Sequence, residues 1–237
     1  LIIQLLNGIT IAGNLILIAL GLAIIFGLLG IINLAHGEFF MVGAYTVVSI
    51  SKITGNFWLG VLLAPLIVAG IGLFMETTVL KRLYNQPLKS LLATWGFSVV
   101  IRQLVKIIFG AGNKMVILPI TENIEIFGVN YPLYRFVLLF FTIFLILIVL
   151  YIFYKMDFGT KCRAVIENRD MASALGIKTK RVDKIMFSFG AGLVGFAGAM
   201  MSPLTSINPQ MGLKYLGESF FVVIIGGIGN LLGVIGG

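Results

Sequence analysis

The chain has 237 residues, of which 59% are hydrophobic and 11% are charged, and its formal net charge is +8. Soluble domains carry about 25% charged residues, so this composition excludes an ordinary water-soluble enzyme or nucleic-acid-binding domain. Apolar runs of about 20 residues recur, which is the length of a membrane-spanning helix, and they lack the strict alternation of barrel strands. We therefore predict an all-α fold, a polytopic transmembrane helical bundle in which residues 1–237 form a single transmembrane domain.

The apolar runs divide the chain into about seven or eight spans. The first run is too long and too apolar for the core of a signal peptide, so we expect it to be retained. Because the chain begins at Leu1 without a methionine and stops in GGIGNLLGVIGG, we expect both ends to be trimmed. We expect membrane helices at about residues 5–30, 37–51, 57–79, 90–109, 132–154, 185–203 and 216–237.

The charges of the loops predict the orientation of the bundle. Residues 80–89 carry three basic residues and no acid, whereas residues 110–131 carry one lysine and two glutamates. Residues 155–184 hold eight of the 17 Lys and Arg residues. Since basic loops stay on the cytoplasmic side, we place 80–89 and 155–184 in the cytoplasm and 110–131 outside.

A polar motif interrupts the apolar sequence near the N-terminus. In NLAHGE, Asn33, His36 and Glu38 lie between two apolar runs without room for a loop. We predict a broken helix near residues 33–38, which lipid tolerates only where the break is buried in protein or lines a cavity. The three side chains either satisfy the broken helix ends or line a polar path.

One face of residues 91–106 is also polar. Trp95, Ser98 and Arg102 are three to four residues apart and share a face of the predicted helix. That face could line a path, and packing against a neighbouring helix explains it equally well. Our candidate path residues are Asn33, His36, Glu38, Trp95, Ser98 and Arg102.

The other charges near the spans have simpler explanations. Glu76, Lys106 and Arg135 lie close to span ends and can extend to the interface. Glu218 can pair with Lys214 four residues earlier.

Nothing in the sequence indicates catalysis. His36 is the only histidine and has no partner at metal-ligand spacing, so we expect no catalytic residue, no metal and no cofactor bound by this chain. GGIGNLLG lacks the Lys-Ser/Thr and the preceding strand of a phosphate-binding loop. The single cysteine, Cys162, allows no internal disulfide.

Small residues predict close helix packing in SFGAGLVGFAGAM. Ala191, Gly195 and Ala199 recur every four residues, a spacing that lets helix backbones approach in lipid.

The polar island 155–184 contains a short helix. Asn168 or Asp170 can cap its start, and Gly176 is suited to end it. Thr179 can then begin the next span. An apolar face of short side chains with basic flanks suits docking into a partner's groove, whereas a merely solvated loop would not need this helix.

At these residues the chain resembles permease subunits of the ABC importers for branched-chain amino acids and urea. The resemblance covers nearly the whole chain and rests on GLAIIFGLLGIINLAHGEFFMVGAY, on FGTKCRAVIENRDMASALGIKTKRVD and on GGIGNLLG. Within the second segment, residues 170–176 are similar to the Glu-Ala-Ala-x-x-x-Gly pattern that seats a coupling helix in the ATPase. Asp and Met replace Glu and Ala there. The resemblance implies ATPase-coupling roles for Arg169, Asp170, Met171, Ala172, Ala174, Leu175 and Gly176.

The resemblance also implies the surrounding machine. This chain would form half of a translocation path in the bacterial inner membrane and would not be an enzyme. Its partners would be cytoplasmic ATPase subunits that use ATP, a second homologous permease, an extracytoplasmic solute-binding protein and membrane lipid, with no nucleic acid.

The cargo depends on the subfamily. PLKSLLATWGFSVVIRQLVKIIFGAGN and YLGESFFVVIIGGIGN are more similar to the urea type, so we expect urea, with branched-chain amino acids as the alternative. An ATPase-independent channel or an ion-coupled carrier is the alternative from another class. An ion-coupled carrier would need carboxylates in mid-span, for which only Glu38 and Glu76 qualify.

Overall fold

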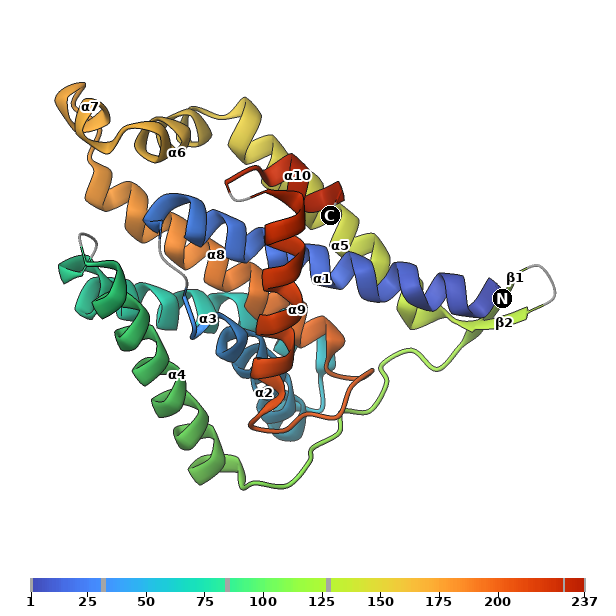
Figure 1. The fold of residues 1–237 in the computed structure, drawn as a ribbon. Coiled ribbons are helices and arrows are strands. Elements are labelled where there is room, and N and C mark those ends of the chain that lie inside the picture. The colour runs from blue at the N-terminus through green and yellow to red at the C-terminus, as the bar shows by residue number, and fades with distance from the viewer. Residues whose placement is uncertain (1, 31–32, 84–85, 127–128, 228, 237) are drawn as a thin grey trace.

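Helices take up most of the chain because a helix satisfies its own backbone hydrogen bonds, as lipid requires. The computed structural model describes residues 2–30, 33–83, 86–126, 129–227 and 229–236. The predicted all-α bundle is confirmed. Its elements (Figure 1) are α1 (Ile2–Leu29), α2 (His36–Thr54), α3 (Phe57–Thr78), η1 (Leu80–Arg82), α4 (Pro87–Phe109), β1 (Asn123–Ile126), β2 (Val129–Pro132), α5 (Leu133–Lys155), α6 (Asp157–Glu167), α7 (Arg169–Ala174), α8 (Thr179–Met201), α9 (Met211–Gly226) and α10 (Leu231–Gly236).

Five of the described helices are long and apolar enough to cross a membrane, namely α1, α3, α4, α5 and α8. The break near residues 33–38 is confirmed, because α1 ends at Leu29 and α2 begins at His36. Residues 31 and 32 within it lie outside the described part of the chain. The span expected at 216–237 is instead two helices, because Gly227 has a φ of 91°, which ends α9 before α10 begins.

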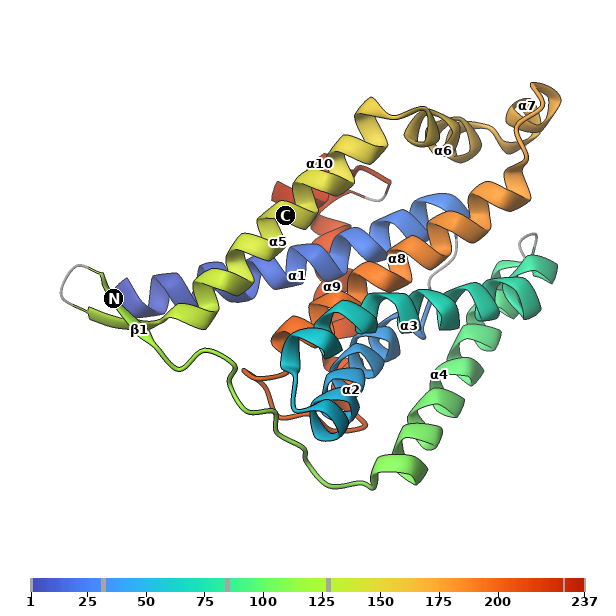
Figure 2. The ribbon, with the colours of Figure 1, turned by 180° about the vertical axis from the view of Figure 1, so that it is seen from behind.

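The central helix of the bundle is α8. Most of its residues after the first turn are buried, and α1 runs antiparallel beside it in both views (Figures 1 and 2). A Cβ added to Gly43 of α2 would lie 2.0 Å from the carbonyl oxygen of Gly195 in α8, and one added to Gly195 would lie 2.6 Å from Val68 Cβ of α3, so α8 packs this closely on both helices because these positions are glycine. The close packing predicted for this small-residue segment is confirmed.

The bundle has two ends, which we call the α7 end and the hairpin end. The junction of α3 with α4 lies at the α7 end, together with α6 and α7 (Figure 1). The antiparallel strands β1 and β2 lie at the hairpin end with the start of α1 (Figure 2). The two loops predicted to be cytoplasmic therefore share one end, and the loop predicted to be outside occupies the other.

In both views α4 stands apart at the edge of the bundle (Figures 1 and 2). Its buried stripe begins with small polar residues rather than large apolar ones, which leaves polar groups facing α2. The stripe consists of Ser90, Thr94, Ser98, Ile101 and Val105.

Candidate translocation site and coupling helix

Glu38, Ser98 and Arg102 meet between α2 and α4, and we call them the Glu38 cluster. Glu38 Oε1 accepts hydrogen bonds from Ser98 Oγ at 2.9 Å and from Arg102 Nη2 at 2.6 Å and Nε at 3.1 Å. Glu38 is 1% exposed, whereas the Arg102 side chain is 25% exposed. A buried carboxylate is stable only with such partners, so this ion pair joins α4 to the bundle.

The break before α2 is fixed by its own side chains. Asn33 Oδ1 accepts from the Ala35 N–H at 3.0 Å, and the Leu34 N–H donates to Thr94 Oγ1 of α4 at 3.2 Å. His36 Nε2 donates to the Ile18 carbonyl oxygen of α1 at 3.1 Å. The structure therefore places His36 against α1 and not with the Glu38 cluster.

Three buried polar atoms at the break have no hydrogen-bond partner within the described residues: Asn33 Nδ2, His36 Nδ1 and Glu38 Oε2. Glu38 Oε2 lies against the start of α9, where a Cβ added to Gly212 would be 2.9 Å away. One carboxylate oxygen is thus occupied by α4, and the other retains its capacity to accept a hydrogen bond.

Two hollows follow one another along α4 on either side of the Glu38 cluster. Toward the hairpin end lies a polar cavity of about 570 Å³, which we call the outer cavity. Toward the α7 end lies an apolar groove of about 310 Å³. The outer cavity is lined by Val99, Arg102, Gln103, Lys106, Ala111, Asn113, Asn208, Pro209 and Gln210, and the groove by Leu34, Leu91, Leu213, Leu216, Gly217 and Phe220.

Trp95 does not join the other candidate path residues. Its side chain is 58% exposed, about 100° around the helix from the buried Thr94. Among the charges expected to reach the interface, Glu76 is instead 1% exposed and faces the bundle. Arg135 donates to Asn7 Oδ1 and lies over the Tyr131 ring.

The charge pair expected in α9 is present. Lys214 Nζ lies 3.8 Å from Glu218 Oε1, and the two side chains are 71% and 37% exposed. Such an exposed pair contributes little stability.

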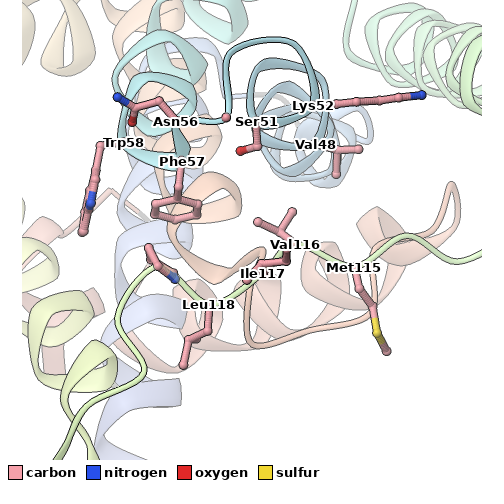
Figure 3. Close-up of a pocket in the computed structure, with 12 residues that line it drawn as sticks. Val48, Ser51, Lys52, Asn56, Phe57, Trp58, Met115, Val116, Ile117 and Leu118 are labelled. Carbon is pink, nitrogen blue, oxygen red and sulfur yellow. The ribbon is translucent and has the colours of Figure 1, made fainter.

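A further cavity has a volume of about 680 Å³ (Figure 3). The α2–α3 turn and residues 115–119 enclose it, and Lys52 extends away from its centre (Figure 3). None of the candidate path residues lines this cavity, so we do not assign it to the path.

The predicted short helix in the polar island is present as α7. Asn168 Oδ1 accepts from the Met171 N–H at 2.9 Å, which is the expected N-cap. Gly176 has a φ of 83°, and the Ile177 N–H donates to the Ala172 carbonyl oxygen at 3.0 Å, which closes the helix. α6, which precedes it, was not expected from the sequence.

Of the seven residues predicted to couple to the ATPase, some are exposed and others face inward. Met171 and Leu175 are 58% and 75% exposed and offer an apolar surface at the α7 end. Asp170, Ala174 and Gly176 are exposed beside them. Ala172 is 2% exposed and packs inward.

Arg169 also points inward, toward α8. Its Nη1 and Nη2 donate to the two carboxylate oxygens of Asp183 at 2.9 and 2.8 Å, and Asp183 is fully buried. This fork fixes α7 near the start of the central helix. Asp183 is a functional candidate that we did not select from the sequence, although a carboxylate at the start of an apolar span was a usable signal.

Cys162 is buried in α6. Burial raises the pKa of its thiol to about 12. Because the thiolate is the reactive form, this cysteine is expected to be inert toward thiol reagents near neutral pH.

The chain was compared with known proteins. The family model described as "Branched-chain amino acid transport system / permease component" matches residues 4–237. The high-affinity branched-chain amino acid transport system permease protein LivH of Salmonella typhimurium is 31% identical, over 99% of this chain and 82% of that protein. BraD of Pseudomonas aeruginosa, which carries the same description, is 27% identical over 97% of this chain and 80% of that protein.

A second type of permease is also similar. LivM of Salmonella typhimurium is 27% identical over 93% of this chain, which corresponds to 58% of that protein. A comparison with solved structures found no match. With a family match over almost its whole length, the chain belongs to the permease components of branched-chain amino acid transport systems.

Proposed function

We propose that this chain is a membrane-spanning permease subunit of an ABC importer and that its cargo is a branched-chain amino acid. The relatives named above are all described as branched-chain amino acid permeases, which favours this cargo over the urea predicted from the sequence. The observation that carries the proposal is the position of the Glu38 cluster between a polar cavity and an apolar groove.

The chemistry of the two hollows suits an aliphatic amino acid. Its carboxylate can bind the Arg102 guanidinium, which faces the outer cavity, and its ammonium group can donate to Glu38 Oε2. Its side chain can occupy the groove lined by Leu213, Leu216 and Phe220. Urea has neither an ionic group nor an apolar side chain, so it would leave the groove without a role.

The energy would come from another subunit. In this proposal α7, with Met171 and Leu175 outermost, docks into a cytoplasmic ATPase that binds and hydrolyses ATP. Similarity to both LivH and LivM supports a second, homologous permease as partner. A solute-binding protein would deliver cargo at the hairpin end. The chain itself would bind no cofactor.

The orientation follows from the charges. The basic α7 end would lie in the cytoplasm and the hairpin end outside, in the inner membrane of a bacterium.

The cargo can be tested by uptake into vesicles that contain the full complex and its matched binding protein. We expect ATP-driven uptake of labelled leucine, which excess unlabelled isoleucine inhibits and a hundredfold excess of urea leaves unchanged, because urea cannot fill the groove. Labelled-urea uptake without leucine uptake would contradict the proposal and restore the urea prediction.

A further inference from the structure

The apolar groove beside the Glu38 cluster has one wall on α9. The groove residues of this helix lie on one face, because they are spaced three, four and seven residues apart: Leu213, Leu216, Gly217 and Phe220. Leu34 and Leu91 line the groove from the break before α2 and from α4. Of the described residues on the α9 wall, Gly217 is the one that brings no side chain, so it leaves additional room in the groove.

Packing within the described chain does not explain a glycine at this position. The other glycines of α9 lie close to a second backbone. A Cβ added to Gly212 would lie 2.6 Å from the Gly37 carbonyl oxygen, and one added to Gly226 would lie 2.5 Å from the Gly233 carbonyl oxygen. A Cβ added to Gly217 would meet no described atom of a neighbouring element within 4 Å. Since glycine weakens a helix relative to alanine, its presence here indicates that another molecule uses the free space.

The groove begins beside the Glu38 carboxylate. Glu38 Oε2 has no hydrogen-bond partner among the described residues and lies 2.9 Å from the position of a Cβ on Gly212. Gly212 directly precedes Leu213, the first groove residue of α9. A ligand that donates a hydrogen bond to Glu38 Oε2 would therefore have the groove ahead of it along α9.

This continuity favours an aliphatic amino acid as the molecule that occupies the groove. Its ammonium group can donate to the Glu38 carboxylate, and its apolar side chain can follow the groove. The acyl chain of a lipid could also fill the groove, but it carries no donor for Glu38 Oε2. The cargo therefore accounts for both the open carboxylate oxygen and the missing side chain at Gly217.

The length of leucine matches the distance from Glu38 to Gly217. Gly217 lies five residues beyond Gly212, which is about 7.5 Å along the helix axis. A hydrogen bond from the ammonium nitrogen to Glu38 Oε2 spans about 3 Å. From that nitrogen to a terminal methyl group of an extended leucine, four bonds of about 1.5 Å cover about 5 Å. The terminal methyl groups of leucine, and the equally distant methyl group of isoleucine, thus reach the level of Gly217.

Shorter aliphatic amino acids end before this level. Valine is one bond shorter than leucine and alanine is two bonds shorter, so their methyl groups end about 1 and about 2.5 Å nearer to Glu38. A side chain at position 217 would therefore crowd leucine and isoleucine most, valine less and alanine least. Such a graded response is expected of a cargo that is held by its ammonium group.

We propose that Gly217 sets the length of the cargo side chain that this permease accepts, by leaving room for the terminal methyl groups of leucine and isoleucine. The inference rests on the proposed function and adds a residue that determines its specificity. Because no described atom of a neighbouring element lies beside Gly217, a substitution there changes the size of the groove without displacing another helix of this chain.

Uptake of three amino acids by Gly217 variants tests this size limit. Gly217→Ala and Gly217→Val are placed in the complete complex in vesicles, with ATP and with the same binding protein loaded with labelled leucine, valine or alanine. The preference of the binding protein cancels when each variant is compared with wild type. A co-purified ATPase subunit reports that the complex has assembled.

Gly70→Ala and Gly70→Val are the matched controls. Gly70 is an exposed glycine of α3 that does not line the groove, and a Cβ added to it would also meet no described atom of another element within 4 Å. Because both sites exchange a helical glycine for the same residue, the controls account for the change in helix stability. The Gly70 variants should leave the uptake of all three amino acids unchanged.

We expect Gly217→Ala to lower leucine uptake about tenfold or more relative to alanine uptake, with valine between them, because one methylene in an apolar site changes discrimination by about 10- to 200-fold. Gly217→Val should widen the difference. Uptake of the three amino acids that falls in proportion, or a complex that no longer assembles, would overturn the inference and show that Gly217 packs against the second permease or a lipid. Unchanged ratios in an assembled complex would overturn it as well. Failure of the wild-type complex to transport leucine would instead contradict the proposed function.

Discussion

Replacement of Arg102 by glutamine is expected to reduce leucine uptake roughly a hundredfold while the complex still assembles. The change leaves Glu38, which is 1% exposed, with Ser98 as its remaining partner in the Glu38 cluster. In the proposed function the Arg102 guanidinium also binds the cargo carboxylate, and each hydrogen bond to a charged group contributes about 1.5–3 kcal/mol. Since about 1.4 kcal/mol corresponds to a factor of ten, loss of this interaction accounts for a roughly hundredfold fall in uptake.

Arg82→Gln is the matched control, because Arg82 is an exposed arginine of η1 at the α7 end. It should leave uptake unchanged. Arg102→Lys keeps the charge but not the forked geometry, so its uptake should lie between wild type and Arg102→Gln. Normal uptake by Arg102→Gln would remove the Glu38 cluster from the path.

Arg169→Ala is expected to reduce leucine uptake more than tenfold by releasing α7 from the bundle. Asp183 is fully buried and accepts two hydrogen bonds from the Arg169 guanidinium. The variant therefore leaves a buried carboxylate without these two donors. A displaced α7 would transmit ATPase closure poorly. The reconstituted complex should therefore transport fewer leucine molecules for each ATP that it hydrolyses.

Arg181→Ala is the control for this second change, because Arg181 is exposed on the first turn of α8. The exchange Arg169→Asp with Asp183→Arg tests the pair itself and should recover part of the coupling. A lowered thermal stability with an unchanged ratio of leucine to ATP would show that the pair only stabilises the fold.

The sequence predicts most of this fold because membrane helices follow from composition and their ends from local chemistry. Asn168 predicts where α7 begins and Gly176 predicts where it ends, and the structure confirms both predictions. The spacing of Ala191, Gly195 and Ala199 likewise predicts close packing by α8. In each case the deciding interaction lies within a few residues along the chain.

Local sequence patterns do not predict which side chains of other helices a residue contacts. Helical spacing places Ser98 and Arg102 on one face, but nothing in the spacing shows that Glu38, on another helix, is their partner. It also places Trp95 on that face, whereas the buried stripe of α4 runs through Thr94 and leaves Trp95 exposed. The rotation of a helix is set by its neighbours and not by its own sequence.

The central claim is that a separate ATPase drives amino acid uptake through this chain. Its most direct test is leucine accumulation in vesicles that hold the complete complex, the binding protein and no ion gradient, with ATP or a non-hydrolysable analogue supplied on the ATPase side. We predict accumulation against the leucine gradient with ATP and none with the analogue. Equal accumulation under both conditions, or accumulation that requires an ion gradient, would contradict the account and favour an ion-coupled carrier.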